Sequence, residues 1–175
     1  MGLVIKTDKR NVVISSLIGT AINRRFHTFK QGVKTGVAVP KTDQFIELTL
    51  HPRYKDNVER YIRVIRALAV KESSEEQLAR LAVLERNLLD PISSAAAALK
   101  LEAIGKEAIP VLKKGLQSPD VEVRFYAAEA LAYLDDKAAT APSGEIATTP
   151  AAFPASALRA RGAVHDFRAS PAHRG

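Results

Sequence analysis

The second half of the sequence repeats itself, and this repeat constrains the fold more than any other feature of the chain. Four apolar residues recur thirty positions later in the same order. They are Ala97, Ala98, Leu101 and Ile104, followed by Ala127, Ala128, Leu131 and Leu134. A second set, Leu81, Leu84 and Leu88, recurs twenty-eight positions later as Ile109, Leu112 and Leu116. Self-similarity at such a period is typical of a solenoid, in which each repeat packs only against its neighbours.

Breaks between the periodic segments divide this part of the chain into two helix pairs. They fall at Asp90-Pro91, at Gly105, at Gln117 to Asp120 and at Asp135. Proline and glycine interrupt helices, and aspartate caps the N-terminus of the helix that follows it. A pair of about thirty residues is shorter than the roughly forty of the usual HEAT repeat, so residues 71–137 are predicted to form short HEAT-like repeats. The predicted repeat core is Leu101, Ile104, Leu131 and Leu134.

Residues 1–70 mix the two-residue period of strands with the helical period. Three short strands are predicted, at Leu3 to Lys6, at Val37 to Val39 and across Ile46, Leu48 and Leu50. A first helix is predicted within VVISSLIGTAINRRF, with Asn11 or Ser15 as its N-cap, although its leading β-branched residues also suit a strand. A second helix begins after Asp56 or Asn57. Together they predict a small α+β unit that joins the repeats near Val70 to Ser74.

Residues 138–175 change abruptly to alanine, proline, serine, threonine and arginine. Such a composition buries too little apolar surface to offset the entropy cost of ordering, so we expect a largely disordered tail. A trace of the repeat persists, since Ala157, Ala160, Val164 and Asp166 lie thirty positions beyond Ala127, Ala130, Leu134 and Asp136. Arg161 stands where a leucine would follow Leu131. We therefore interpret the tail as a degenerated third repeat.

Composition and charge narrow the classes of function. The chain has no cysteine, which excludes disulfides, thiolate zinc sites and a cysteine nucleophile. The net charge of +7 is unevenly distributed: residues 1–70 carry 13 Lys or Arg against 5 Asp or Glu and are strongly basic, whereas residues 71–137 carry 9 against 12. A basic surface attracts anionic partners, whether nucleic acid, acidic protein or cell-wall polymer. No segment has the length and apolar character of a membrane span, and MGLVIKTDKR does not resemble an export signal.

Five arginines are the candidate partner surface. Arg60, Arg63 and Arg66 recur every third residue on the second predicted helix, and Arg24 with Arg25 closes the first. They could form an anion-binding face for a partner. Alternatively they form a solvated helix face, since cations are favourable near a helix C-terminus, and this second interpretation is favoured. Nucleic acid would also require interleaved aromatic residues or a recognition fold, so the sequence argues against it.

The remaining polar residues do not form a catalytic, cofactor or metal site in the sequence pattern. His27, His51, His165 and His173 lie on predicted loops or in the tail, without the spacing of metal ligands. The acidic residues Glu72, Glu75 and Glu76 are predicted to begin a helix capped by Ser73 or Ser74, where negative charge is favourable. The stretch GVKTG lacks the ending of a phosphate-binding loop. We therefore expect no enzyme activity, no cofactor and no metal.

Three stretches resemble the bacterial flagellar P-ring protein, in a form with a HEAT-like extension. They are SLIGTAINRRF, GVAVPKTDQFIELTLHPRYKDNVERYIRVIRAL and RFYAAEALAYLDD, and the AIN triplet at Ala21 to Asn23 is part of the likeness. The resemblance covers about residues 3–137. It implies a non-enzymatic structural component of the flagellar basal body, a ring around the rod in the periplasm near peptidoglycan. Its partners would be other P-ring subunits and flagellar rod or ring proteins.

The chain departs from that family by lacking an export signal and most of the family's N-terminal half. We therefore expect a truncated fragment, which would stay in the cytoplasm if it is expressed as written. Two other functions stay open from the residues alone. One is a protein-binding scaffold that uses the concave surface of the repeats, and the other is a basic module that binds anions or nucleic acid.

Overall fold

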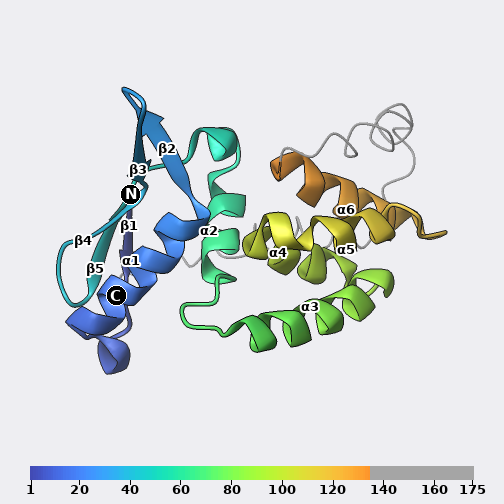
Figure 1. Ribbon diagram of the computed structural model, residues 1–175, viewed down its shortest axis with the longest axis horizontal. Helices are drawn as coiled ribbons and strands as arrows, with labels where there is room; N and C mark the ends of the chain where they lie inside the picture. Colours follow the sequence, from blue (N-terminus) through green and yellow to red (C-terminus); the bar gives the residue numbers. More distant parts are fainter. Residues whose placement is uncertain (135–175) are drawn as a thin grey trace, which may run out of the picture.

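The computed structural model describes residues 1–134, so Asp135 and the predicted tail 138–175 lie outside the described residues (Figure 1). Within this range, an N-terminal α+β unit with small antiparallel sheets is followed by an all-helical segment of packed helices. The predicted fold class is confirmed for both parts. Among the helices of residues 1–134, none is long and apolar enough to cross a membrane.

A three-stranded antiparallel sheet forms one layer of the N-terminal unit, in the order β1-β5-β4. Its strands are β1 (Gly2–Val4), β4 (Ala38–Pro40) and β5 (Phe45–Leu48). The register pairs Leu3 with Ile46 and Ala38 with Leu48, which places these apolar side chains on the face that is turned to the core. All three predicted strands are therefore present, with ends shifted by one or two residues.

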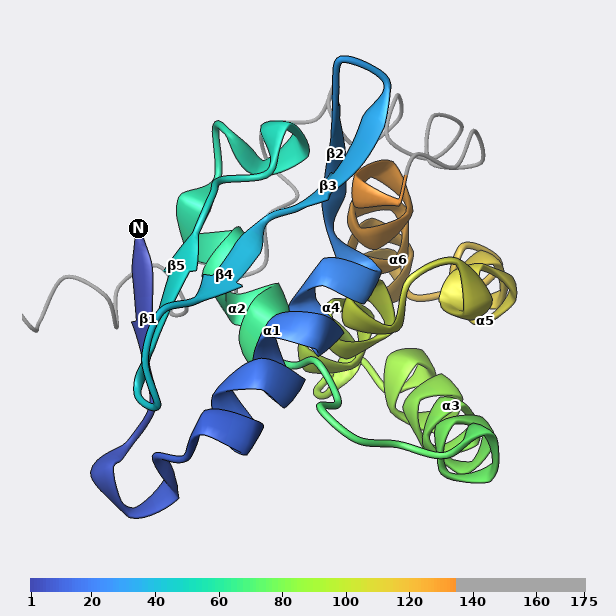
Figure 2. The same ribbon diagram turned by 60° about the vertical axis from the view of Figure 1, so that its left-hand side comes forward.

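A separate hairpin projects from this unit and consists of β2 (His27–Lys30) and β3 (Val33–Gly36) (Figure 2). Its two turn residues, Gln31 and Gly32, have φ angles of 50° and 80°, which is the left-handed conformation that a two-residue hairpin turn requires. The sequence does not predict the hairpin, because its strands lack a continuous alternation of apolar and polar residues. His27, predicted to lie on a loop, begins β2 instead.

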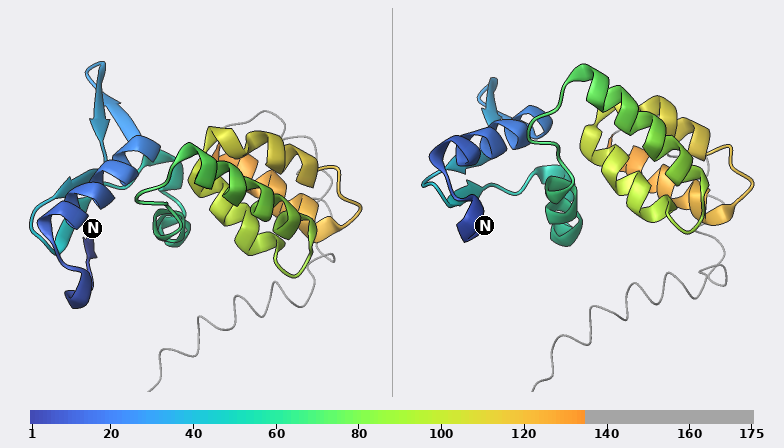
Figure 3. Two further views of the ribbon diagram at one scale, coloured as in Figure 1. Left: turned by 60° about the horizontal axis from the view of Figure 1, so that its bottom comes forward. Right: turned by 90° about the horizontal axis from the view of Figure 1, so that it is seen from below.

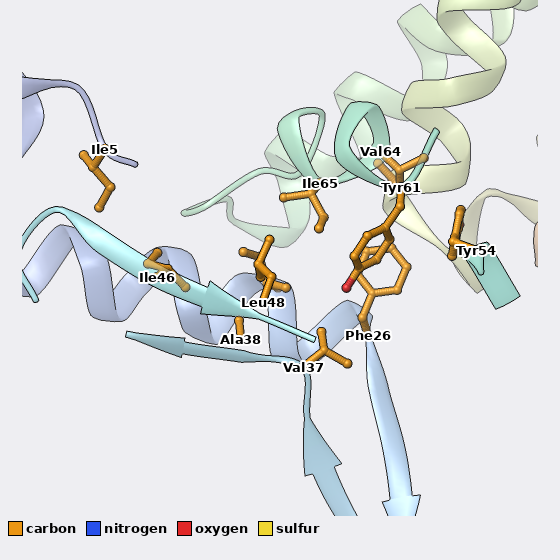
Figure 4. Packing of buried hydrophobic residues seen from close by; sticks show 12 residues of the cluster. Ile5, Phe26, Val37, Ala38, Ile46, Leu48, Tyr54, Tyr61, Val64 and Ile65 are labelled. Atoms are coloured by element: carbon orange, nitrogen blue, oxygen red, sulfur yellow. The ribbon is translucent and has the colours of Figure 1, made fainter. Parts of the chain in front are cut away.

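Two helices pack against the inner face of the sheet, α1 (Val12–Arg25) and α2 (Val58–Arg66). Each begins at a predicted cap: the Asn11 side chain accepts a hydrogen bond from the Val13 amide at 2.7 Å, and Asn57 accepts one from the Arg60 amide at 3.0 Å. Between the helices and the sheet lies an apolar core that includes Phe26 and Tyr61 (Figure 4). Two short 3-10 helices, η1 (Thr7–Lys9) and η2 (Pro52–Tyr54), complete the unit.

The helical segment contains two helix pairs within the described residues. They are α3 (Ser74–Leu89) with α4 (Ser94–Ile104), and α5 (Ile109–Gly115), preceded by η3 (Lys106–Ala108), with α6 (Val121–Tyr133). The second pair stacks on the first, so that α5 lies beside α3 and α6 beside α4 (Figure 3). The predicted breaks before residue 135 all separate helices. Ser73 caps α3 and forms a capping box with Glu76, as its sequence indicates.

Equivalent positions of the two pairs occupy equivalent places in the helical core. Leu101 and Leu131 are both fully buried, and Leu134 is buried with them, whereas Ile104 packs at the edge of the same cluster. The alanines of the repeat are also buried. Small side chains let the helices approach closely: at Gly115, an added Cβ would lie 2.8 Å from the Cβ of Ala127.

Replacing Leu101 or Leu131 with alanine should lower the free energy of unfolding by about 2–5 kcal/mol, because each change leaves a cavity in a packed core. Leu78→Ala is the matched control, since Leu78 lies on α3 with 67% of its surface exposed. Chemical denaturation of the three variants measures the difference. A Leu101→Ala variant as stable as the control would contradict the assignment of Leu101 to the repeat core.

Candidate functional site at the junction of the two units

The apolar core of the N-terminal unit continues into the helical segment. Helix α4 contacts α2, and Ala103 of α4 is buried in the core of the N-terminal unit. Leu99 and Tyr133 pack against the same core from α4 and α6. The connection between α2 and α3 spans residues 67–73, where the sequence predicts the join. The two units thus share buried surface beyond this connection.

An ion pair lies buried in the shared surface. Glu102 of α4 is fully buried, and its Oε2 lies 2.6 Å from Nη2 and 3.0 Å from Nε of Arg60, whose side chain is 11% exposed. The hydroxyl of Tyr54 donates a hydrogen bond to Oε1 of Glu102 at 2.7 Å. Arg60 also reaches α6, with its Nη1 2.7 Å from Oε2 of Glu129. A single guanidinium on α2 therefore holds α4 and α6 together.

Burial and charge act in opposite directions on this cluster. Burial raises the pKa of Glu102, and the hydrogen bonds and charge of Arg60, with the bond from Tyr54, oppose that rise. Burial also tends to lower the pKa of Arg60, but the carboxylates of Glu102 and Glu129 outweigh it and raise that pKa above its ordinary value. A buried ion pair adds little net stability, whereas removal of one partner leaves an uncompensated charge at a cost of about 3–5 kcal/mol. The cluster thus favours one relative orientation of the units.

Two more arginines of the N-terminal unit cap helices of the other unit. The Nε and Nη2 of Arg25 donate to the main-chain oxygen of Glu102 at 3.2 and 2.8 Å, in the last turn of α4. The Nη1 of Arg53 donates to the main-chain oxygen of Tyr133 at 2.9 Å, at the end of α6. Helix C-termini carry unsatisfied carbonyls and a partial negative charge. The N-terminal unit therefore supplies cations to the C-terminal ends of both α4 and α6.

Aromatic rings fill the space around the ion pair. Tyr54 stacks on Tyr133 with ring centroids 4.8 Å apart, and the guanidinium of Arg60 lies 4.5 Å above the Tyr133 ring. Phe26 meets Tyr54 and Tyr61 edge-on, at 5.6 and 5.2 Å. The contacts between rings stabilise the packing, and the cation–π contact adds an attraction between Arg60 and the Tyr133 ring. The junction is consequently a packed interior.

The five candidate arginines do not share one surface, which corrects the sequence prediction for two of them. Arg24, Arg63 and Arg66 are exposed, whereas Arg25 and Arg60 face the helical segment. Three residues advance a helix by about 300°, so a three-residue spacing places Arg60 and Arg66 roughly 120° apart around the axis. An arginine every third residue therefore spreads over the helix surface and can place one member inside.

Sequence reasoning missed the partners of Arg60 in this site, and Glu102 is the central one. Its position offered a signal, since it follows Ala98 by four residues and Leu101 by one, within the stripe that becomes buried. A carboxylate at such a position predicts a buried partner. The partner itself lies 42 residues away on α2, at a distance that no local pattern reveals.

The two histidines of the described chain lie beside the junction and not in a metal site. His51 precedes η2 and packs on Phe26 at 5.7 Å, and His27 follows α1. Burial lowers the pKa of both, and nearby cations lower it further: Lys34, Lys106 and Arg25 around His27, and Arg53 and Arg25 around His51. Residues 1–134 contain no group of three or more histidines and carboxylates that could hold a metal ion.

Comparison of the chain with protein-family models, with curated proteins and with solved structures found no match. The resemblance to the flagellar P-ring protein thus stays a prediction.

Replacing Arg60 with alanine should lower the free energy of unfolding by about 3–5 kcal/mol, because buried Glu102 then loses its counter-charge. The control is Arg63→Ala on the same helix, where the side chain is exposed and the effect should stay within about 0.5 kcal/mol. Equilibrium unfolding in urea measures both. Equal effects of the two substitutions would contradict the assigned role of Arg60.

Stability should fall as the pH falls below about 6.5, the ordinary pKa of histidine. The lowered pKa values of His27 and His51 mean that the unfolded chain binds more protons than the folded chain in this range. His51→Asn keeps an acceptor for the Arg53 amide, which His51 Nδ1 binds at 3.3 Å, but removes the titration. Melting temperatures between pH 7.5 and 5.5 should therefore change less in this variant, and an unchanged slope would contradict the assignment.

Proposed function

We propose that this chain is a non-enzymatic structural component that assembles with further copies of itself, as its resemblance to the flagellar P-ring protein implies. The observation that carries the proposal is the outer face and free edge of the three-stranded sheet. The cellular setting comes from the resemblance alone: the basal body in the periplasm, with rod and ring proteins as further partners.

The outer face of the sheet presents apolar side chains to solvent. Val4 is 74% exposed and lies opposite Phe45, which is 38% exposed. Val39 is 48% exposed and lies opposite Glu47, whose carboxylate is paired with Lys41 at 2.9 Å. Exposed apolar residues that gather on one face and are rimmed by charges are typical of protein–protein contact sites. This face therefore suits another protein surface.

The β1 edge of the sheet offers main-chain groups for pairing. In the antiparallel ladder between β1 and β5, the main chains of Met1 and Leu48 hydrogen-bond to each other, and such pairs alternate with pairs that are not hydrogen-bonded. Leu3 and Ile46 therefore form the next hydrogen-bonded pair, and the main-chain N–H and C=O groups of Gly2 and Val4 point away from β5. The opposite edge of the sheet, along β4, is occupied at Ala38. The side-chain amide of Asn23 donates a hydrogen bond to the main-chain oxygen of Ala38 and accepts one from the Ala38 N–H, both at 2.8 Å. Of the two edges of this three-stranded sheet, β1 is thus the one open to strand addition.

The fixed junction and the charge distribution favour a second copy as the occupant. A ring forms when one surface of a subunit binds a different surface of the next at a constant angle. The Arg60 cluster gives the subunit a fixed shape, and the basic N-terminal unit complements the acidic first turn of α3, which holds Glu75 and Glu76. Head-to-tail association of copies uses both features.

Substitution of Val4 with lysine should weaken self-association, because it places a charge on the apolar face and at the open edge. We expect sedimentation velocity to show association of the unaltered chain that grows with concentration and is lost in Val4→Lys. Ile92→Lys is the matched control, since Ile92 is 96% exposed in the turn between α3 and α4. A chain that stays monomeric at every concentration, or equal loss in the control, would contradict the proposal.

A further inference from the structure

A cleft of about 520 Å³ lies beside the junction, between the N-terminal unit and the start of the helical segment. The end of α1, the start of β2 and the segment around η2 form one side of it. The rest of its lining comes from the connection to α3, two residues of α3, the end of α4 with the following η3, and the end of α6. Its volume lies within the roughly 300–1,000 Å³ typical of sites for small molecules.

Basic side chains outnumber acidic ones in the lining of this cleft. Its Lys and Arg residues are Arg24, Arg25, Arg53, Arg80 and Lys106, and its acidic residues are Glu72 and Glu107. Glu72 binds Arg80 through both oxygens at 2.7 Å, so these two side chains neutralise each other. Glu107 is then the one acidic residue left in the lining, against the four cations Arg24, Arg25, Arg53 and Lys106. The cleft thus keeps a surplus of positive charge.

The surplus remains after the helix ends are considered. Arg25 donates to the carbonyl of Glu102, which satisfies two of its N–H groups without cancelling its charge. The C-termini of α4 and α6 contribute about half a negative charge each, which is together about the charge of one guanidinium and less than the surplus. Arg24 and Lys106 are exposed at the same cleft. Three cations can therefore approach one ligand.

Both histidines of the cleft report the same positive environment. After burial, the cations Lys34, Lys106 and Arg25 lower the pKa of His27. The Nδ1 of His27 is buried and has no hydrogen-bond partner within residues 1–134. The positive surroundings of both histidines thus favour a negatively charged group in the cleft.

We propose that this cleft binds a small anion that carries phosphate or carboxylate groups. The guanidinium groups of Arg24 and Arg25 can hold such groups in a bidentate manner, and Lys106 adds a compact positive charge. His27 lines the same cleft. A bound anion favours the protonated imidazole, so affinity rises as the pH falls toward the pKa of His27.

The test uses the full chain and the ring-proton NMR signals of its histidines, titrated separately with pyrophosphate and with citrate. We expect saturable shifts of the His27 and His51 signals and an upward shift of the His27 pKa. The tighter of the two anions identifies phosphate or carboxylate as the preferred group. The absence of saturable shifts with both anions would overturn the proposal.

Two exposed cations of the cleft provide the variants. Arg24→Gln and Lys106→Gln should each weaken binding about tenfold or more, the loss expected for a hydrogen bond to a charged group. Arg63→Gln is the control, because Arg63 is an exposed arginine outside the cleft. Equal weakening in all three variants would reduce the effect to net charge and overturn the site. The measurement does not depend on self-association, so it fails or succeeds separately from the proposed assembly.

Discussion

The ion pair between Arg60 and Glu102 is the interaction on which the arrangement of the two units depends. A carboxylate removed from water is strongly destabilising unless charge and hydrogen bonds replace its hydration. Here the replacement comes wholly from the N-terminal unit, through Arg60 and Tyr54, while the carboxylate belongs to α4. Sliding or rotating one unit against the other would leave Glu102 without its partners. The cost of that state selects one orientation.

Other features of the junction follow from that orientation. With α2 fixed against α4, Arg25 and Arg53 reach the C-terminal ends of α4 and α6, which would otherwise expose unpaired carbonyls. The same placement leaves the basic cleft beside the junction, while the three-stranded sheet lies at the end of the N-terminal unit away from α3 to α6 (Figure 1). One rigid subunit can then carry a ligand site and an assembly surface at different places.

Sequence patterns predicted the features that depend on neighbours along the chain. Asn11, Asn57 and Ser73 cap the helices that their positions indicate, and the thirty-residue repeat locates Leu101 and Leu131 in the core. Each of these roles is set within one or two turns of helix, or by a periodicity that one sequence displays.

Roles set by distant partners could not be predicted in this way. Arg60 and Arg63 look alike along α2, yet only Arg60 meets a carboxylate across the junction. The role of Asn23 in the AIN triplet depends on β4, which the sequence does not place beside it. The Asn23 amide makes the two main-chain hydrogen bonds to Ala38 that a neighbouring strand would otherwise make. Gly36 of β3 fits the same arrangement, because an added Cβ would lie 2.4 Å from the Asn23 side chain.

Native-state hydrogen exchange tests most directly whether the buried ion pair makes one cooperative body of the two units. Slowly exchanging amides of α2 and β5 should share one opening free energy, and one denaturant dependence, with those of α4 and α6, because neither unit can open without exposing the Arg60–Glu102 pair. If the amides of α2 and β5 exchange at a distinctly lower free energy while α4 and α6 stay protected, the N-terminal unit opens by itself. That result would contradict the account.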